Sequence, residues 1–301
     1  MAGADGFAVA EHGPRVSAVV VNYNAGAILT DCVQAVLASP GKVRVTVIDN
    51  RSSDNSMERL ADELGSHQRL GVRRNDSNLG FARAVNDFAR TDDSDFLLVI
   101  NPDCVLHDHA LEQLVAALDD QPTAALAGPM VHDGSGRLES ACFRYFPRPW
   151  NSLVTFTGLW RLGRWIPGLR GIRPLHVEDM QAVVNAEATS GACMLLRLDA
   201  FRRVGCFDEG YGMHCEDLDL MYRLQHEGWR CLFVPGARAT HEQGISSRSR
   251  PFWVHRQKHR GMWRFYRKLL SREYASPVTA LVALGIATRY FILLPLIWLK
   301  K

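Results

Sequence analysis

The sequence predicts an α/β protein with a mixed, mostly parallel sheet, flanking helices and a C-terminal basic and hydrophobic helical extension. Three observations support this fold class. Apolar, β-branched runs alternate with amphipathic segments from residue 16 onward, which is typical of parallel strands covered on both faces. Polar clusters directly follow the apolar runs. Beyond residue 245 the composition changes to basic and aromatic residues and then to a long apolar run.

The first hundred residues contain most of the predicted sheet. Each strand is an apolar run that ends in polar or turn residues, and each helix has apolar residues at helical spacing. We expect strands at 16–22, 43–48, 72–74 and 96–100, and helices at 28–38, 56–64 and 78–90. Right-handed crossovers between such strands produce a Rossmann-like sheet, whose ligands bind at the carboxyl ends of the strands.

The remainder of the chain is less regular. Residues 142–178 contain four prolines and three tryptophans, which predicts a long, mobile insertion. Regular patterns then predict a strand at 192–198, a short helix capped by Asp199, a helix at 216–227 and a strand at 230–234. The expected organisation is a main domain at 15–245 and a helical region at 246–301.

Composition excludes several classes of protein. The chain has 301 residues, 47% of them hydrophobic, and a net charge of +3, so it is neither disordered nor built wholly around nucleic acid. Its seven cysteines form no C-x-x-C pair, which argues against a disulfide framework or zinc module and favours a reducing compartment. Residues 1–15 lack the features of a secretory signal. No phosphate-binding loop or three-glycine dinucleotide motif occurs.

Four polar clusters follow predicted strands or open a helix, where a doubly wound sheet would bring them together. They are Asn22-Tyr23-Asn24, then Asp49-Asn50 with Ser53 and Asp54, then Asn101-Pro102-Asp103, and Glu216-Asp217 with Asp219. Asp103 suits a hard divalent cation such as Mg²⁺ or Mn²⁺, which prefers oxygen ligands. Each cluster also has a structural interpretation.

Most of these polar residues can also be explained by a structural role alone. Asn-Pro-Asp is a common turn sequence, and Asp49 can cap a turn. Glu216 and Asp217 would favour a helix N-terminus through the helix dipole, and a lone histidine such as His241 is more often structural than catalytic. Arg223 fits a carboxylate-orienting, phosphate-contacting or helix-surface residue. The joint occurrence of the clusters favours a functional site.

Five ordered motifs in residues 15–245 resemble family 2 glycosyltransferases of the GT-A fold, in the rhamnosyltransferase-like branch. VSAVVVNYNAG resembles the opening strand and donor-binding turn, and VTVIDNRSSDNS the following nucleotide-binding segment. NDSNLGFARAVN is similar to the N-x-G-F-A segment of this branch. FLLVINPDC corresponds to a D-x-D motif written N-P-D, and GACMLLRLDAFRRVGCFDEGYGMHCEDLDLMYRLQHEGWR to the acceptor-side block.

The resemblance implies residue roles. Asp103 would coordinate the metal, with His241 completing the site. Asp217 would be the general base, with Glu216 beside it. The donor-binding residues would be Asn22, Tyr23, Asn24, Asp49, Asn50, Ser53, Asn78, Gly80, Asn101 and Arg223. Asn101 replaces the first acid of the D-x-D pattern, so the metal has one charged ligand fewer.

The resemblance also implies a function. It implies an inverting, metal-dependent hexosyltransferase using Mg²⁺ or Mn²⁺ and a nucleotide-diphosphate sugar, with dTDP-rhamnose preferred. The acceptor would be a glycan or polyprenyl-diphosphate-linked sugar of bacterial surface polysaccharide synthesis. Alternatives are a galactosyl- or other hexosyltransferase using a UDP-sugar, and a catalytically degenerate membrane-associated scaffold. A nucleotide-sugar pyrophosphorylase is disfavoured because its Gly-rich basic loop is missing.

The C-terminal region predicts membrane association. Residues 246–272 contain nine Lys or Arg and no acid, interleaved with aromatic residues, and residues 277–299 are apolar apart from Arg289. This length approaches a bilayer span, although Pro295 and Arg289 fit an interfacial helix equally well. We expect a cytoplasmic protein held peripherally on the inner face of the cell membrane. A buried helix pair and a nucleic-acid-binding segment are the alternatives.

Overall fold

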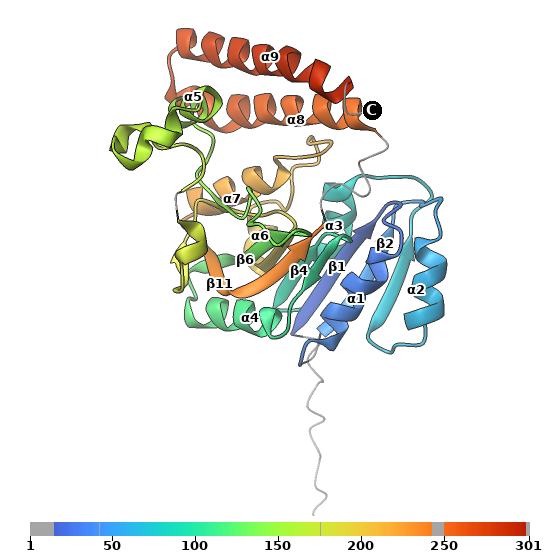
Figure 1. The fold of residues 1–301 in the computed structure, drawn as a ribbon. Helices are drawn as coiled ribbons and strands as arrows, with labels where there is room; N and C mark the ends of the chain where they lie inside the picture. The colour runs from blue at the N-terminus through green and yellow to red at the C-terminus, as the bar shows by residue number, and fades with distance from the viewer. Residues whose placement is uncertain (1–14, 42, 175, 243–249, 299–301) are drawn as a thin grey trace, which may run out of the picture.

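The computed structural model describes residues 15–41, 43–174, 176–242 and 250–298. A central sheet has helices on both faces, and two long C-terminal helices form a further layer at one end (Figure 1). The strand order is β3-β2-β1-β4-β10-β6-β11-β5, with β8 paired to β11 outside this path. The strands are β1 (Val16–Asn22), β2 (Val43–Asp49), β3 (Leu70–Arg74), β4 (Phe96–Ile100), β5 (Cys104–Leu106), β6 (Ala124–Asp133), β8 (Val184–Asn185), β10 (Cys193–Arg197) and β11 (Arg230–His241).

The N-terminal half of the sheet is parallel, as predicted. β1 pairs with both β2 and β4, and β2 pairs with β3. Every residue of β1 is buried, because helices cover both faces of this part of the sheet. The register places Asn22 opposite Asp49, so the polar residues that end β1 and β2 lie at the same edge.

The helices of this half have largely the predicted bounds. They are α1 (Ile28–Ala38), α2 (Ser56–Leu64) and α3 (Phe81–Ala89). The helix predicted at 78–90 begins only at Phe81, because Gly80 has a φ of +83° that is incompatible with a right-handed helix.

The C-terminal half of the sheet contains elements that the sequence did not indicate. The sequence patterns do not predict α4 (Ala110–Asp120) or β6, and β6 is parallel to β11. β10 lies antiparallel between β4 and β6, which makes the sheet mixed. The strand predicted at 230–234 continues to His241, because a register shift between Val234 and Arg238 lets pairing resume after Pro235.

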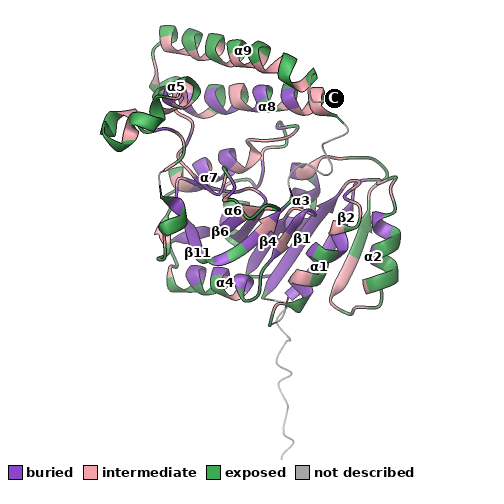
Figure 2. Ribbon diagram, in the orientation of Figure 1, coloured by how far each residue is buried: buried purple, intermediate pink, exposed green. Residues whose placement is uncertain are grey.

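Two apolar cores lie on opposite faces of the sheet. The first packs α1 and α4 against it through residues such as Leu29, Val33 and Leu114. The second gathers α3, α6 (Leu198–Arg203), α7 (Glu216–His226) and α8 (Pro251–Phe265). The buried colour of the sheet in Figure 2 follows this layered packing. All seven cysteines are free, as expected without a disulfide framework.

The predicted insertion at 142–178 contains several short elements. They are β7 (Phe143–Arg144), α5 (Pro149–Thr157) and the short 3-10 helices Leu159–Arg164, Pro167–Leu169 and Val177–Asp179. β7 pairs with β9 (Ala188–Thr189) in a separate small sheet. The Trp150 indole donates to the carbonyl oxygen of Gly168 at 2.8 Å, and the Ile172 amide donates to Thr155 Oγ1 at 2.8 Å.

The C-terminal region consists of α8, a π-helical turn (Tyr266–Leu270), a 3-10 turn (Ser271–Glu273) and α9 (Ser276–Trp298). α8 and the turn after it are anchored in the second core by Phe265, Tyr266 and Leu270. α9 lies along α8 and is long and apolar enough to cross a membrane, and its most apolar stretch contains no buried residue. The domain boundary expected at 245/246 lies outside the described residues.

Candidate active site

The turns after β1 and β2 are joined by a buried hydrogen-bond network. Asn22 Nδ2 donates to Asp49 Oδ1 at 2.9 Å and to Ser56 Oγ at 2.9 Å. Ser52 Oγ donates to the same Asp49 oxygen at 2.5 Å. Asn22 and Asp49 are therefore rigidly positioned at the carboxyl edge of the sheet, where the sequence predicted donor binding.

Asn24 adds a second link between these turns. It has a φ of +54°, and its Oδ1 accepts the backbone N–H of Ser53 at 2.7 Å. Tyr23 points to the C-terminal region instead, because the Arg250 guanidinium donates to its hydroxyl at 3.0 Å and lies 5.7 Å from its ring centre. The turn after β1 thus contacts the residue that precedes α8.

The third predicted donor segment lies beside the second. Asn75 Nδ2 donates to Asn50 Oδ1 at 2.8 Å, and Asn50 Nδ2 donates to the Gly80 carbonyl at 3.4 Å. Asn78 is exposed, and its Oδ1 accepts the Gly80 N–H at 2.9 Å. The structure therefore brings Asn50, Asn78 and Gly80 together around the start of α3.

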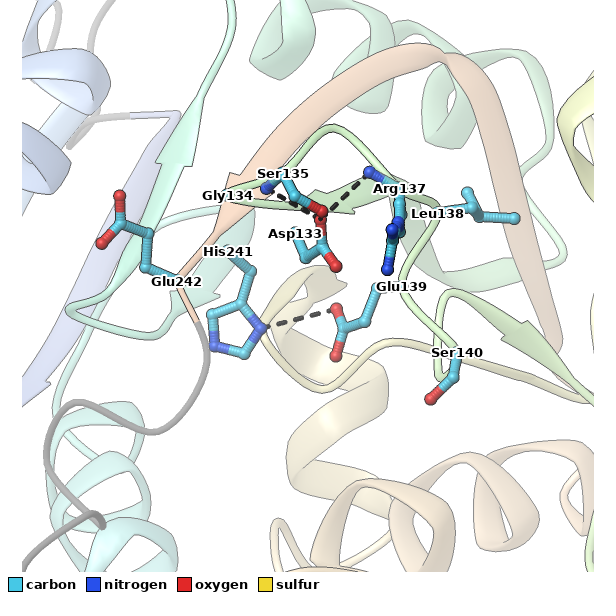
Figure 3. Close-up of a pocket in the computed structure, with 9 residues that line it drawn as sticks. All are labelled: Asp133, Gly134, Ser135, Arg137, Leu138, Glu139, Ser140, His241 and Glu242. Carbon is cyan, nitrogen blue, oxygen red and sulfur yellow. Dashed lines mark hydrogen bonds and ion pairs between the residues drawn. The ribbon is translucent and has the colours of Figure 1, made fainter.

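Asp103 and His241 meet at the junction of β5 and β11. His241 is directly opposite Cys104 in this antiparallel pair, and its Nε2 lies 3.1 Å from Asp103 Oδ1. Its Nδ1 lies 3.5 Å from Glu139 Oε2 (Figure 3). Burial alone would lower the pKa of His241, but hydrogen bonds with Asp103 and Glu139 outweigh that effect and raise it to about 10.

This arrangement fits a cation. Two buried carboxylates flank one imidazole, so the positive charge of a protonated ring or a divalent ion is favourable there. His241 and Glu139 also line an open pocket of about 620 Å³ formed mainly by the 133–140 loop. Among the described residues, no group of three or more His, Cys, Asp or Glu side chains is arranged to hold a metal. Asp103 and His241 therefore supply only part of a coordination shell.

Asp217 lies in the first turn of α7 and is held by Arg144 from β7. The Arg144 guanidinium donates to Asp217 Oδ2, and both side chains are less than one-fifth exposed. Glu216 precedes it, with Oε2 buried and unbonded within the described part of the chain. Burial, and after it the charge of Asp217, raises the pKa of Glu216 to about 8.

A short backbone segment separates Asp217 from the Asp103 cluster. A Cβ built on Gly191 would lie 2.9 Å from both Cβ and Oδ2 of Asp217. The next residue, Ala192, accepts the Asn101 N–H at 2.8 Å. Asn101 opens the turn that carries Asp103, so the base candidate and the metal-ligand candidate lie on two sides of this segment.

Arg223 is placed away from these groups. Its Nε donates to Asp219 Oδ1 at 2.5 Å, and its two terminal nitrogens donate to the carbonyl oxygens of Val204 and Cys206. All three nitrogens are committed to the protein framework. The contact with Asp219 matches the carboxylate-orienting interpretation of Arg223, and the contacts with Val204 and Cys206 direct the guanidinium to the protein framework.

Several residues at the site were not identified from the sequence. Arg144 and Glu139 belong to irregular segments, and Gly191 forms no recognisable motif alone. Ser190 Oγ donates to Glu139 Oε2 at 3.1 Å, which ties the pocket to the segment beside Asp217. The signal in the sequence is weak: Arg144 lies within the aromatic run 143–146, and Glu139 precedes that run by four residues.

Comparison with known proteins agrees with this arrangement. The model of the family described as "Glycosyltransferase like family 2" matches residues 14–264. The chain belongs to this family. The glycosyltransferase is 28% identical over 242 residues to an N-acetylglucosaminyl-diphospho-decaprenol L-rhamnosyltransferase of Mycobacterium tuberculosis, covering 76% of each chain. It is also 28% identical over 167 residues to rhamnosyltransferase WbbL of Escherichia coli, covering 55% of this chain and 59% of that protein.

Solved structures confirm the predicted fold of this glycosyltransferase. The mannosyltransferase PcManGT from Pyrobaculum calidifontis, solved with GDP-Man and Mn²⁺, aligns with a TM-score of 0.60 at 16% identity. The alignment covers 94% of this chain and 71% of that chain. The two proteins therefore share the GT-A fold, including its mixed, mostly parallel sheet with helices on both faces.

Proposed function

We propose that this glycosyltransferase transfers L-rhamnose, with inversion, from dTDP-rhamnose to a hydroxyl of a sugar carried on a polyprenyl diphosphate. The names of both rhamnosyltransferase relatives support the donor sugar, and the mycobacterial relative's name supports the acceptor class. The observation that carries the proposal is the position of Asp217 and Asp103 on two sides of the Gly191-Ala192 segment. Assembly of bacterial surface polysaccharide is the corresponding process.

The donor would lie along the carboxyl edge of β1, β2 and β4. Asn22, Asp49 and Asn50 are the polar groups there for the nucleotide, with Tyr23, Asn24 and Ser53 at its entrance. Asp103 and His241 would hold Mg²⁺ or Mn²⁺, with the other coordination positions supplied by the diphosphate and water. When bound, such an ion neutralises the charge that develops on the leaving diphosphate.

Asp217 would take the proton from the acceptor hydroxyl as that oxygen bonds to the anomeric carbon. The bond from this carbon to the donor phosphate oxygen breaks, and the nucleoside diphosphate leaves. Arg144 holds Asp217 in one orientation. Burial, and after it the charge of Asp217, raises the pKa of Glu216 to about 8, so Glu216 retains its proton more readily than an ordinary glutamate.

A UDP-hexose donor is the alternative within the same chemistry. The degenerate scaffold has less support, because Asp49, Asp103 and Asp217 are all present and oriented by hydrogen bonds. Asn101 is the one departure that favours it.

We further propose that the enzyme works at the inner face of the cell membrane. α9 presents exposed apolar side chains along its length, including Leu281, Leu284 and Phe291. The insertion adds Trp150 and Trp165, which are 58% and 65% exposed. Phe146, which precedes α5, packs on Phe265 of α8 with ring centres 6.2 Å apart, so the start of the insertion contacts the C-terminal region. Aromatic and apolar surface of this kind suits a bilayer interface.

Asp217→Asn tests the proposed chemistry. We expect loss of rhamnosyl transfer by about 10²- to 10⁴-fold, since an amide does not accept the proton, while donor binding persists. Transfer is measured with dTDP-rhamnose and with UDP-hexoses on a prenyl-diphosphate-linked N-acetylglucosamine. Thermal shifts with dTDP, UDP, GDP and CDP, each with Mn²⁺ or EDTA, measure nucleotide binding.

These measurements separate the parts of the proposal. A metal-dependent shift with dTDP supports the rhamnose donor, whereas a shift with UDP alone replaces it with a UDP-sugar. Full activity in EDTA would remove the metal role of Asp103 and His241. Substantial turnover by Asp217→Asn would remove Asp217 as the base.

A further inference from the structure

Four cationic side chains from four segments lie close enough to interact electrostatically beside the turn that precedes α7 and carries Glu216 and Asp217 into place. They are Arg144 on β7, Arg173 in the insertion, Lys258 on α8 and Arg289 on α9. We call them the cationic cluster. Only Arg144 is paired with a described acid, and that acid is Asp217.

α8 places Lys258 beside this turn. A Cβ built on Gly261 would lie 2.7 Å from the carbonyl oxygen of His214, and one built on Gly212 would lie 2.7 Å from Gln257 Oε1. Gln257 and Lys258 precede Gly261 by four and three positions, so each neighbours Gly261 on the helix surface. Lys258 therefore lies at the edge of the face of α8 that packs on the turn, with its side chain exposed.

Hydrogen bonds position the other two cations, Arg173 and Arg289. The Tyr145 amide donates to the carbonyl oxygen of Ile172 at 2.7 Å, which places Arg173 next to Arg144. Arg289 lies 2.9 Å from Nε2 of His259, the residue that follows Lys258. The insertion and α9 thus each contribute one cation to the same place.

The charges of the cluster are not balanced within the described part of the chain. Arg173 and Lys258 are exposed and are paired with no acid there, and Nε of Arg144 is buried and unbonded. Burial, and after it the charge of Arg144, lowers the pKa of Arg173, and the charge of Glu139 opposes this only in part. Desolvation, and after it the charge of Arg289, lowers the pKa of Lys258, and Arg144 and Arg173 act in the same direction. Burial and then Lys258 lower the pKa of His214 to about 4. Such mutual repulsion is relieved when an anion binds.

We propose that the cationic cluster binds the diphosphate of the lipid-linked acceptor. This inference rests on the proposed function and extends it to a binding site. The sugar of the acceptor lies at Asp217, and the diphosphate on its other end contacts Arg144, Arg173, Lys258 and Arg289. The prenyl chain then leaves along the apolar side chains of α9.

The position of the cluster distinguishes it from the donor diphosphate site. The donor diphosphate belongs with Asp103 and His241, on the other side of the Gly191-Ala192 segment. The cationic cluster lies on the side of α8 and α9, and α9 has an exposed surface (Figure 2) that is rich in apolar side chains. A ligand with an anionic head and a long hydrocarbon chain matches both features.

Lys258→Met and Arg173→Gln, singly and together, test this site in the full chain. Binding of farnesyl diphosphate is measured calorimetrically in detergent, with farnesol and inorganic pyrophosphate as reference probes. We expect each single variant to weaken farnesyl diphosphate binding about tenfold, the size expected for one charge-assisted contact. Farnesol binding should be unchanged. Arg256→Gln, an exposed cation on another face of α8, is the matched control and should bind as the wild type does.

Catalysis provides a second readout. The variants should raise KM for a prenyl-diphosphate-linked N-acetylglucosamine about tenfold and leave turnover of octyl N-acetylglucosaminide, which has no diphosphate, within about twofold. Melting temperatures and the dTDP-Mn²⁺ thermal shift confirm that the variants are folded and bind the nucleotide.

Three outcomes would overturn the inference. They are unchanged farnesyl diphosphate affinity in the double variant, an equal loss in Arg256→Gln, and a loss confined to co-sedimentation with phosphatidylglycerol vesicles, which would assign the cations to lipid headgroups. If the wild type transfers no sugar, the proposed function fails, and the calorimetric measurement still decides whether the cluster binds a prenyl diphosphate.

Discussion

Gly191 packs closely against Asp217 in the candidate active site. Its Cα faces Asp217 so closely that an added methyl group would lie 2.9 Å from the carboxylate oxygen. Gly191 does not have a positive φ, so its backbone accepts alanine, and the constraint is the space beside the base. Arg144 contacts Asp217 Oδ2, so the carboxylate is held between a cation and a backbone segment.

Gly191→Ala is therefore expected to displace Asp217 and reduce kcat about tenfold or more, because small misplacements of a base have large effects on rate. Steady-state kinetics measure kcat, and the dTDP-Mn²⁺ thermal shift should remain as in the wild type. Gly168→Ala is the control, since its added Cβ meets nothing within 4 Å. A kcat equal to that of the wild type would show that Asp217 tolerates the methyl group.

At the level of elements, α7 carries the candidate base Asp217 and, two residues later, Asp219, which anchors the helix. Asp219 is fully buried and accepts hydrogen bonds from Arg223, from Tyr211 at 3.1 Å and from Lys268 at 2.7 Å. Lys268 belongs to the turn after α8, so this carboxylate joins α7 to the C-terminal region. The orientation of Asp217 thus depends on a buried ionic network on the same helix.

Asp219→Asn should lower the free energy of unfolding by about 3–5 kcal/mol, because it leaves the largely buried Arg223 without its anionic partner and removes one of the two acids that pair with Lys268. Urea denaturation measures this change. Asp199→Asn provides the contrast: its ion pair with Arg203 is exposed, and such pairs contribute about 0–1 kcal/mol. Similar losses in the two variants would argue against a special role for the buried network.

At the scale of the whole molecule, α8 and α9 differ in how they belong to the fold. α8 and the turn after it bury Phe265, Tyr266 and Leu270 in the second core. α9 contacts α8 through polar groups, including Tyr290, whose carbonyl oxygen lies 3.0 Å from His255 Nε2. Its apolar side chains face outward, which leaves them available to a bilayer.

Removal of α9 alone, by ending the chain after Ala275, should reduce co-sedimentation with phosphatidylglycerol vesicles about tenfold or more, because most of the exposed apolar surface is lost. This truncation retains α8 and its buried side chains, which a truncation near residue 245 would remove. A cooperative thermal transition checks that the shortened chain is folded. Equal sedimentation of the two chains would place membrane contact elsewhere or rule it out.

The sequence by itself determined the N-terminal half of the sheet and the placement of its polar ends. Buried β-branched runs such as 16–22 have few alternatives to a central strand, and parallel pairing then brings Asn22 opposite Asp49. The motifs also identified the family. These features are local along the chain, because each depends on the order of residues within about ten positions.

Only the tertiary structure decided which distant residues meet. Arg144 reaches Asp217 across 73 positions of sequence, and His241 reaches Asp103 across 138. The side chain of Arg223 donates to Asp219. The residues of the cationic cluster come from four segments that share no sequence motif. The physical reason is that side-chain contacts and charge repulsion depend on distances in space, which packing of the sheet, the insertion and the C-terminal helices sets.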